Sequence, residues 1–217
     1  ADPGHVVTDR FDTQPSTFAG AAIQHCEERG STDWTERWMA AEILAATAVA
    51  EVVTNTPFDE PAVVAGLEAE LESNARLVVA NSMPIRDLDA FLPTSSSPLR
   101  ILTNRGASGI DGTVSTATGV AFRSDTPTVL FTGDLALVHD FSGLAAVRRL
   151  GVQLTVVVAD NDGGGIFSFL PIADANHIDH HRLFHTPHGL DLGLTAEFTG
   201  AALHRPDDPT SLGVALR

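Results

Sequence analysis

The fold of this chain is decided by the stretch Thr128-Val129-Leu130, which runs into the turn Phe131-Thr132-Gly133-Asp134. A second stretch repeats the pattern: Leu154-Thr155-Val156-Val157-Val158 runs into Asp160-Asn161-Asp162-Gly163-Gly164-Gly165. Each apolar run is typical of a parallel strand buried on both faces. Asp134 and Asn161 are 27 positions apart, with a helical stretch between them. We therefore expect both at the carboxyl ends of neighbouring strands, where open α/β sheets bind ligands.

The residue types in these two turns favour a hard cation that holds a diphosphate. Asp134 offers a carboxylate oxygen, Asn161 an amide oxygen and Gly163 a main-chain carbonyl, and such oxygens suit Mg²⁺. The run of three glycines lets the backbone approach phosphates closely, since no Cβ intrudes. The simpler interpretation, which local chemistry favours equally, is that Asp134 is a helix N-cap and residues 161–163 are an ordinary turn.

Apolar runs alternating with helical patterns predict an α/β fold, a doubly wound parallel sheet with helices on both faces. The expected domains are 1–54, a domain tail with a linker helix, and 55–217, a binding domain that we expect to be incomplete at its C-terminus. The predicted strands are 77–80, 100–103 and those ending at Gly133 and Asp160, with a further possible strand at 5–7. The predicted helices are 17–29, 33–53, 60–73, one ending near Phe122, and 135–150; residues 93–98 are predicted to form a loop.

Composition narrows the classes of function. The formal net charge is −15, and all 13 basic residues are arginine. This acidity makes binding to nucleic acid or to an anionic membrane unfavourable. No run is long and apolar enough for a transmembrane helix. The single Cys26 is typical of a reducing compartment, so we expect a cytoplasmic protein without stable membrane insertion.

Four blocks of sequence carry a family resemblance. They are Asn81-Ser82-Met83-Pro84-Ile85-Arg86-Asp87, residues 104–112 (NRGASGIDG), Gly133-Asp134-Leu135 and Gly163-Gly164-Gly165-Ile166-Phe167-Ser168. Gly133-Asp134 followed by Asn161 resembles the metal and diphosphate motif of thiamine-diphosphate-dependent enzymes. The four blocks together, in this order over residues 55–205, resemble the MenD family of that superfamily. The family tolerates Leu135, where the superfamily usually has glycine. Asp160 replaces a common asparagine, so we expect its charge to point away or be neutralised.

The resemblance implies a role for individual residues. Asp134, Asn161 and the Gly163 carbonyl would hold Mg²⁺ or Mn²⁺. Ile110 would be the apolar support beneath the thiazolium ring, and a plain core position is the alternative. The other implied cofactor-binding residues are Ser82, Met83, Gly133, Leu135, Ala136, Gly164 and Ile166.

The resemblance also implies which residues bind the substrates. Arg86 and Arg105 would bind substrate carboxylates near Ser82, because a guanidinium pairs with a carboxylate through two hydrogen bonds. Phe167 and Leu170 would form an apolar wall with Ile166. Plain core packing is the alternative for that wall.

The implied activity is a step of menaquinone biosynthesis. With thiamine diphosphate and Mg²⁺ or Mn²⁺, such an enzyme decarboxylates 2-oxoglutarate and adds the succinyl-semialdehyde carbanion to isochorismate. The products are 2-succinyl-5-enolpyruvyl-6-hydroxy-3-cyclohexene-1-carboxylate and CO₂. The family forms its sites between subunits, so at least a homodimer is implied. Its activating glutamate comes from a separate N-terminal domain, and no glutamate of this chain matches it.

Two other functions remain open. One is a different thiamine-diphosphate 2-oxoacid decarboxylase or carboligase, similar to acetohydroxyacid synthase. The other is an inactive cofactor-binding fragment that needs its N-terminal half. The histidines between His177 and His188 lack the regular spacing of a zinc site. Thr186-Pro187-His188-Gly189 resembles a loop that the family carries near the active site, so we expect this segment to cover the cleft.

Overall fold

A computed structural model describes residues 4, 6–27, 30–93 and 99–217. The chain divides into two compact units, residues 1–45 and 46–217. The predicted boundary between residues 54 and 55 concerns domains of the longer family proteins and stays a prediction.

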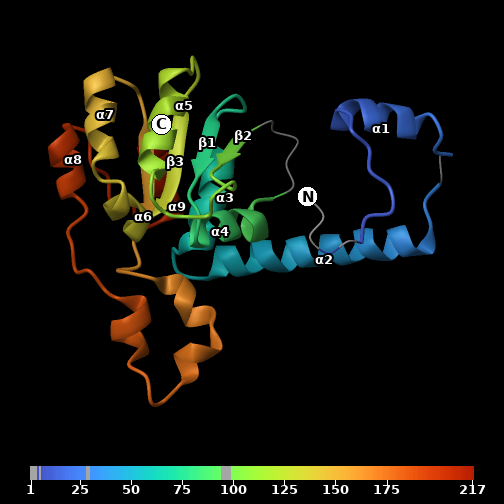
Figure 1. Ribbon diagram of the computed structural model, residues 1–217. Coiled ribbons are helices and arrows are strands. Elements are labelled where there is room, and N and C mark those ends of the chain that lie inside the picture. Colours follow the sequence, from blue (N-terminus) through green and yellow to red (C-terminus); the bar gives the residue numbers. More distant parts are fainter. Residues whose placement is uncertain (1–3, 5, 28–29, 94–98) are drawn as a thin grey trace. The chain divides into compact units, whose positions relative to one another are not determined.

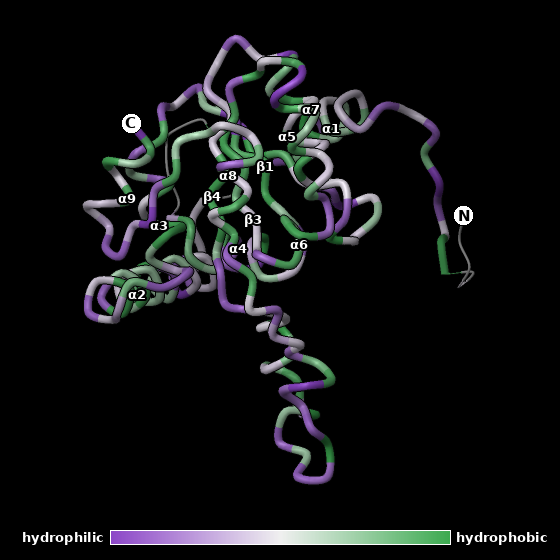
Figure 2. The backbone as a smooth tube through the Cα atoms, turned by 90° about the vertical axis from the view of Figure 1, so that its left-hand side faces the viewer, coloured by the Kyte–Doolittle hydropathy of each residue, from purple (hydrophilic) through white to green (hydrophobic). Residues whose placement is uncertain are grey.

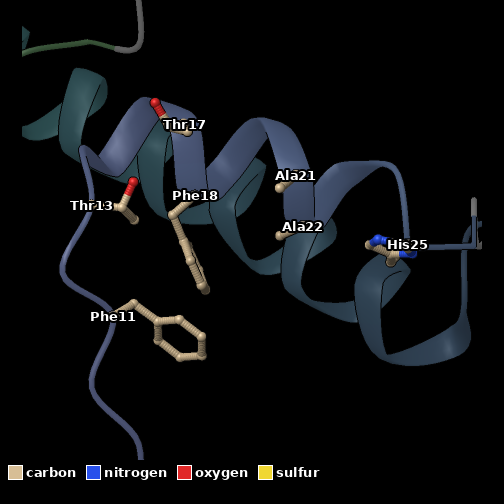
Figure 3. A pocket seen from close by; sticks show the side chains of 7 residues that line it. All are labelled: Phe11, Thr13, Thr17, Phe18, Ala21, Ala22 and His25. Carbon is tan, nitrogen blue, oxygen red and sulfur yellow. The ribbon is translucent and has the colours of Figure 1, made fainter.

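The first unit contains helix α1 (Pro15–Ile23) and the start of helix α2 (Asp33–Asn55). Phe11 packs against Phe18 with ring centroids 4.9 Å apart. These rings line an apolar hollow that no predicted site residue borders (Figure 3). None of the described residues of this unit is buried, so it has no core of its own. The strand predicted at 5–7 is absent at Val6 and Val7, while His5 lies outside the described residues.

The second unit is built on a parallel sheet in the order β2-β1-β3-β4 (Figure 1). The strands are β1 (Arg76–Val79), β2 (Arg100–Thr103), β3 (Thr128–Gly133) and β4 (Thr155–Ala159). All four were predicted from their apolar runs. Gly133 pairs with Ala159, so β3 and β4 end side by side.

Two hydrophobic layers cover the two faces of this sheet. On one face, Val64 of α3 (Glu60–Glu70) and Leu88 of α4 (Met83–Phe91) pack with Phe131 of β3. On the other face, Val114 of α5 (Thr113–Phe122) and Leu137 of α6 (Asp134–His139) pack with Leu130, which immediately precedes Phe131. Successive residues of a strand point to opposite faces, so β3 is buried on both. The helices of this unit are α3 (Glu60–Glu70), α4 (Met83–Phe91), α5 (Thr113–Phe122), α6 (Asp134–His139), α7 (Gly143–Leu150), α8 (Leu194–Thr199) and α9 (Pro209–Leu216).

The helix predicted over 135–150 is wrong as a single helix, because the chain breaks at residues 140–142 to give α6 and α7. Asp140 turns inward, 7% exposed, and accepts hydrogen bonds from the backbone N–H and the hydroxyl of Ser115. Ser115 is the third residue of α5, whose N-cap, Gly112, has no side chain. Asp140 therefore caps α5 from another element, which ends α6.

Other differences are smaller. Helix α1 begins at Pro15 and ends at Ile23, before the predicted end, whose last two residues lie outside the described part. Helix α3 ends at Glu70 rather than at residue 73. Helix α4 was not predicted at all, and the loop predicted at 93–98 lies outside the described residues except Pro93.

Candidate functional site

The strand order places the site. From β1 the chain passes outward to β2 and then to β3 on the other side of β1. The carboxyl ends of β1 and β3 thus flank the point at which the order reverses, where doubly wound sheets bind ligands. Ser82 follows β1 and Asp134 follows β3. The placement predicted for Asp134 and Asn161, at the ends of neighbouring strands, is confirmed.

Asp134 is the first residue of α6 and is only 2% exposed. Its Oδ1 accepts a hydrogen bond from the N–H of Leu135 over 2.5 Å. Its Oδ2 accepts one from the N–H of Gly163 over 2.7 Å. A buried carboxylate needs such partners. The contact with Gly163 joins the turns after β3 and β4, as the sequence predicted for a shared site.

Asn161 lies on the exposed side of the same edge. Its Nδ2 donates to Oε1 of Glu60 over 2.9 Å. Glu60 in turn contacts Asp87, which is 3% exposed. Burial, followed by the charge of Glu60 and a hydrogen bond to it, raises the pKa of Asp87 to about 7. This chain of polar side chains is a feature that the sequence did not reveal.

Two of the three glycines after Asn161, Gly163 and Gly164, lie against the protein's own backbone. Gly163 has φ of 145°, which disfavours a side chain, and its N–H bonds to Asp134. A Cβ at this position would overlap the carbonyl oxygen of His185. Gly164 donates to that same oxygen over 2.6 Å. Gly163 and Gly164 are thus required by packing against the π-helical turn His181–His185. Their predicted approach to a diphosphate stays a prediction.

His188 lies over the acidic turn. Its Nε2 is 3.2 Å from Oδ2 of Asp134, and its Nδ1 accepts the N–H of Leu190. With Nδ1 accepting, Nε2 carries the proton and donates to Asp134. Oxygens of Asp134 and Asp160 and a ring nitrogen of His188 all lie within 4.8 Å of one another. The expectation that residues 186–189 lie near the site is met by this contact.

Asp162 binds the backbone of the loop that carries His188. Its Oδ1 accepts the N–H of Gly189 over 2.7 Å and that of His188 over 3.0 Å. The bond from Gly189 is the main reason that the pKa of Asp162 lies below its usual value. Asp160 is close to half exposed, with Oδ1 4.0 Å from Nε2 of His188. We expected the charge of Asp160 to point away or be neutralised. The group that lies beside this charge is His188.

Both predicted substrate arginines converge on the turn after β1. Asn81 is buried, and its Oδ1 accepts from Nη1 of Arg105 over 2.6 Å. Nη1 of Arg86 donates to the carbonyl of Ser82 over 2.6 Å. Ser82 has φ of 72°, a left-handed conformation that is uncommon for a residue with a side chain. Both arginines are exposed, and their guanidinium groups donate hydrogen bonds to two adjacent residues, Asn81 and Ser82.

Asn81 also organises the loop that carries Ile110. Its Nδ2 donates to the carbonyl oxygens of Asn104 and Gly109 over 3.0 Å and 2.5 Å. Ile110 is partly buried just before α5. The remaining predicted cofactor residues lie along the same edge of the sheet: Met83 opens α4, Gly133 ends β3, Leu135 and Ala136 lie in α6, and Gly164 and Ile166 follow β4.

The predicted apolar wall lies on a projecting arm. Residues 165–185, orange in Figure 1, form 3₁₀ and π-helical turns that extend away from the sheet, and Figure 2 shows the same projection from the side. Phe167 contacts Phe184 edge-on, with centroids 6.2 Å apart. Leu170 is 47% exposed. Phe167 is 39% exposed, so plain core packing does not hold for Phe167 or Leu170, whereas Ile166 is partly buried and that alternative stays open for it.

Several residues of this site were not predicted. Glu60 belonged to no motif, and Asn81 and Asp87 belonged to a family block without an assigned role. A signal existed only for Asn81, a polar residue that directly follows an apolar run.

Comparison with known proteins defines the class of protein to which the chain belongs. The family model of the thiamine pyrophosphate enzyme C-terminal TPP-binding domain matches residues 88–216. The chain belongs to this family. Thiamine pyrophosphate is another name for thiamine diphosphate. Benzoylformate decarboxylase from Polynucleobacter necessarius has a similar fold, with a TM-score of 0.61 and 19% identity over 75% of this chain and 31% of that one.

Curated relatives place the chain in a narrower family within this class. The chain is 47% identical to the 2-succinyl-5-enolpyruvyl-6-hydroxy-3-cyclohexene-1-carboxylate synthase of Myxococcus xanthus, over 100% of this chain and 37% of that protein. It is 41% identical to the synthase of the same name from Salinibacter ruber, over 97% of this chain and 35% of that protein. The resemblance to the MenD family is thus confirmed. The chain spans a little over a third of the length of these two curated relatives.

Proposed function

We propose that this chain is the diphosphate-binding part of a 2-succinyl-5-enolpyruvyl-6-hydroxy-3-cyclohexene-1-carboxylate synthase. The observation that carries the proposal is the buried carboxylate of Asp134, bonded to the N–H of Gly163 at the carboxyl ends of β3 and β4. Relatives that bear this name match the whole chain or nearly all of it. The α/β fold and the family match support the cofactor class.

The donor set fits a hard cation. Asp134, Asn161 and Gly163 would hold Mg²⁺ or Mn²⁺, because they offer carboxylate, amide and carbonyl oxygens at one edge of the sheet. Bound thiamine diphosphate supplies an electron sink for the loss of CO₂ from a 2-oxo acid, while the protein supplies binding and charge. Residues 82–83 and 133–136 surround the diphosphate in this proposal, with Ile110 supporting the ring. His188 must leave Oδ2 of Asp134 for a cation to reach that oxygen.

The substrates are proposed to be 2-oxoglutarate and isochorismate. Both are multiply charged anions, whereas this chain carries a formal net charge of −15. Local positive charge must therefore offset the overall field. Arg86 and Arg105 supply it, and their anchoring at Ser82 and Asn81 limits the entropy lost when a carboxylate binds. Phe167 and Leu170 would exclude water beside the reacting carbon.

The proposal extends to the assembly and the compartment. We infer a site completed by the N-terminal part of such a synthase within at least a homodimer, which would bring the activating glutamate. No helix in the described ranges is long and apolar enough to cross a membrane. The free, exposed thiol of Cys26 suits a reducing compartment, so we propose a cytoplasmic location.

The test is Mg²⁺-dependent binding of thiamine diphosphate, measured by isothermal titration calorimetry. Asp134→Ala and Asn161→Ala should abolish binding, whereas Asp125→Ala, an exposed aspartate before the opposite end of β3, should not. Unchanged binding in the first two variants would refute the site. Turnover of 2-oxoglutarate with isochorismate, after addition of a matching N-terminal half, tests the reaction. Turnover of pyruvate alone would instead favour the acetohydroxyacid-synthase-like alternative.

A further inference from the structure

The side-chain amide of Asn161 has a partner to which the function proposed above gives no role. Nδ2 of Asn161 donates to Oε1 of Glu60 over 2.9 Å, and the two residues are 101 positions apart. Glu60 is the first residue of α3, a helix on one face of the sheet, and Asn161 follows β4. The contact therefore ties the loop after the last strand of the sheet order to the helical layer.

This contact decides which way round the amide lies. A carboxamide has two unlike ends, an oxygen that accepts and an NH₂ group that only donates. With Nδ2 held by Glu60, Oδ1 is the end left for a cation, which takes oxygen ligands. A flipped amide would turn the hydrogens of its NH₂ group toward the cation. Gly165 leaves room for this orientation, since a Cβ there would lie 2.8 Å from Nδ2.

Glu60 is itself contacted by a second acidic side chain, that of Asp87. Helix α4 packs on α3 and carries Asp87, whose Oδ2 is buried without a hydrogen-bond donor in the described part of the chain. A proton on Asp87 explains this oxygen, because the protonated carboxyl donates to Glu60. Glu60 thereby presents an oriented oxygen acceptor to Asn161. Partners of this kind, which orient a metal ligand without touching the metal, tune metal affinity.

We propose that Glu60 is a positioning residue for the metal site: it orients the amide of Asn161 so that Oδ1 faces the cation, and Asp87 steadies it. This inference rests on the proposed function, since it needs Asn161 to be a metal ligand. It assigns the orientation of that ligand to a glutamate 101 positions away.

The first test is Mn²⁺ affinity in the presence of thiamine diphosphate, read from the electron paramagnetic resonance signal of free Mn²⁺. Glu60→Ala should weaken the affinity by about tenfold, the usual effect of losing a partner of a metal ligand. Glu60→Gln keeps an oxygen acceptor and should recover most of it. Glu68→Ala removes a partly buried glutamate from the same helix and should leave the affinity unchanged. Far-ultraviolet circular dichroism checks that each variant is folded.

A double-mutant cycle separates positioning from general structure. In an Asn161→Asp background the ligand has two equivalent oxygens and needs no orientation. Glu60→Ala should then cause no loss of Mn²⁺ affinity, and relief of repulsion between the two carboxylates should even increase it. An equal loss in both backgrounds would overturn the positioning role, as would an unchanged affinity in Glu60→Ala alone.

A measurement without metal or cofactor keeps the inference distinguishable from the proposed function. The side-chain amide resonances of Asn161 are assigned from their disappearance in Asn161→Asp, and they should shift in Glu60→Ala but not in Glu68→Ala. A parent chain that fails to bind Mn²⁺ overturns the metal site and this proposal with it. A parent that binds, with Asn161 resonances unaffected by Glu60→Ala, overturns the positioning role alone.

Discussion

Replacing Asp87 by asparagine should change how the stability of the 46–217 unit depends on pH. Asp87 is 3% exposed on α4, beside Glu60. Burial first, and then the charge of Glu60, raise its pKa from 3.8 to about 7 in the folded chain. The folded chain therefore binds a proton that the unfolded chain has already lost. Between these two pKa values the free energy of unfolding must fall as the pH rises, and the fall ends above the folded value.

The size of the effect follows from the shift. About three pKa units at about 1.4 kcal/mol each give roughly 4 kcal/mol over the whole window. Between about pH 5 and about pH 8 the loss is about 3 kcal/mol, because part of the window lies below pH 5. Asparagine resembles the protonated acid, since its NH₂ group can donate to Glu60. Asp87→Asn should therefore match the parent more closely near pH 5 and be the more stable protein near pH 8.

The assay is urea unfolding at several pH values. Both tryptophans, Trp34 and Trp38, lie in the 1–45 unit, so their fluorescence would report the wrong part of the chain. Far-ultraviolet circular dichroism follows all helices of the chain, those of the sheet unit included. Asp89→Asn, an exposed aspartate on the same helix, is the control for removing a carboxylate. A stability difference between Asp87→Asn and the parent that stays constant, within about 0.5 kcal/mol, from about pH 5 to about pH 8 would refute the reasoning.

Three further predictions concern the core and the loops of the site. Phe131→Ala should lower the free energy of unfolding by about 3–5 kcal/mol, because its fully buried ring would leave a cavity. Gly163→Ala should cost more than about 1 kcal/mol and speed hydrogen exchange around His185, since its φ is 145° and the new methyl group would meet the carbonyl of that residue. His188→Ala should tighten Mn²⁺ binding about fivefold, because a hydrogen bond worth about 1 kcal/mol no longer occupies Asp134.

Each of these changes has a matched control. Phe122→Ala removes a ring that is 55% exposed and should cost far less than Phe131→Ala; equal losses would contradict the buried role of β3. Gly151→Ala imposes backbone strain without a clash, so it should leave exchange around His185 unchanged. His177→Ala removes an exposed histidine from the projecting arm and should not alter Mn²⁺ binding. Weaker Mn²⁺ binding in His188→Ala would show that His188 assists the cation instead of competing with it.

Much of this protein was determined by the sequence itself. Apolar runs predicted the four described strands, and the polar residues after two of them predicted Asp134 and Asn161 at neighbouring strand ends, because the pattern of a strand is a local property. The motifs around Ser82, Arg105 and Gly133 gave the family. Local pattern was insufficient at Asp140, where a hydrogen bond to another helix breaks a continuous helical signal.

Only the tertiary structure decided what surrounds the site residues. Glu60 reaches Asn161 across 101 positions, and His188 reaches Asp134 across 54. No periodicity or spacing encodes such pairs, because they depend on how helices and loops pack against the finished sheet. The glycines after Asn161 show the same limit. In the sequence they indicate a phosphate-binding turn, whereas in the folded chain the carbonyls of His185 and Phe184 occupy the space that side chains at Gly163 and Gly164 would need.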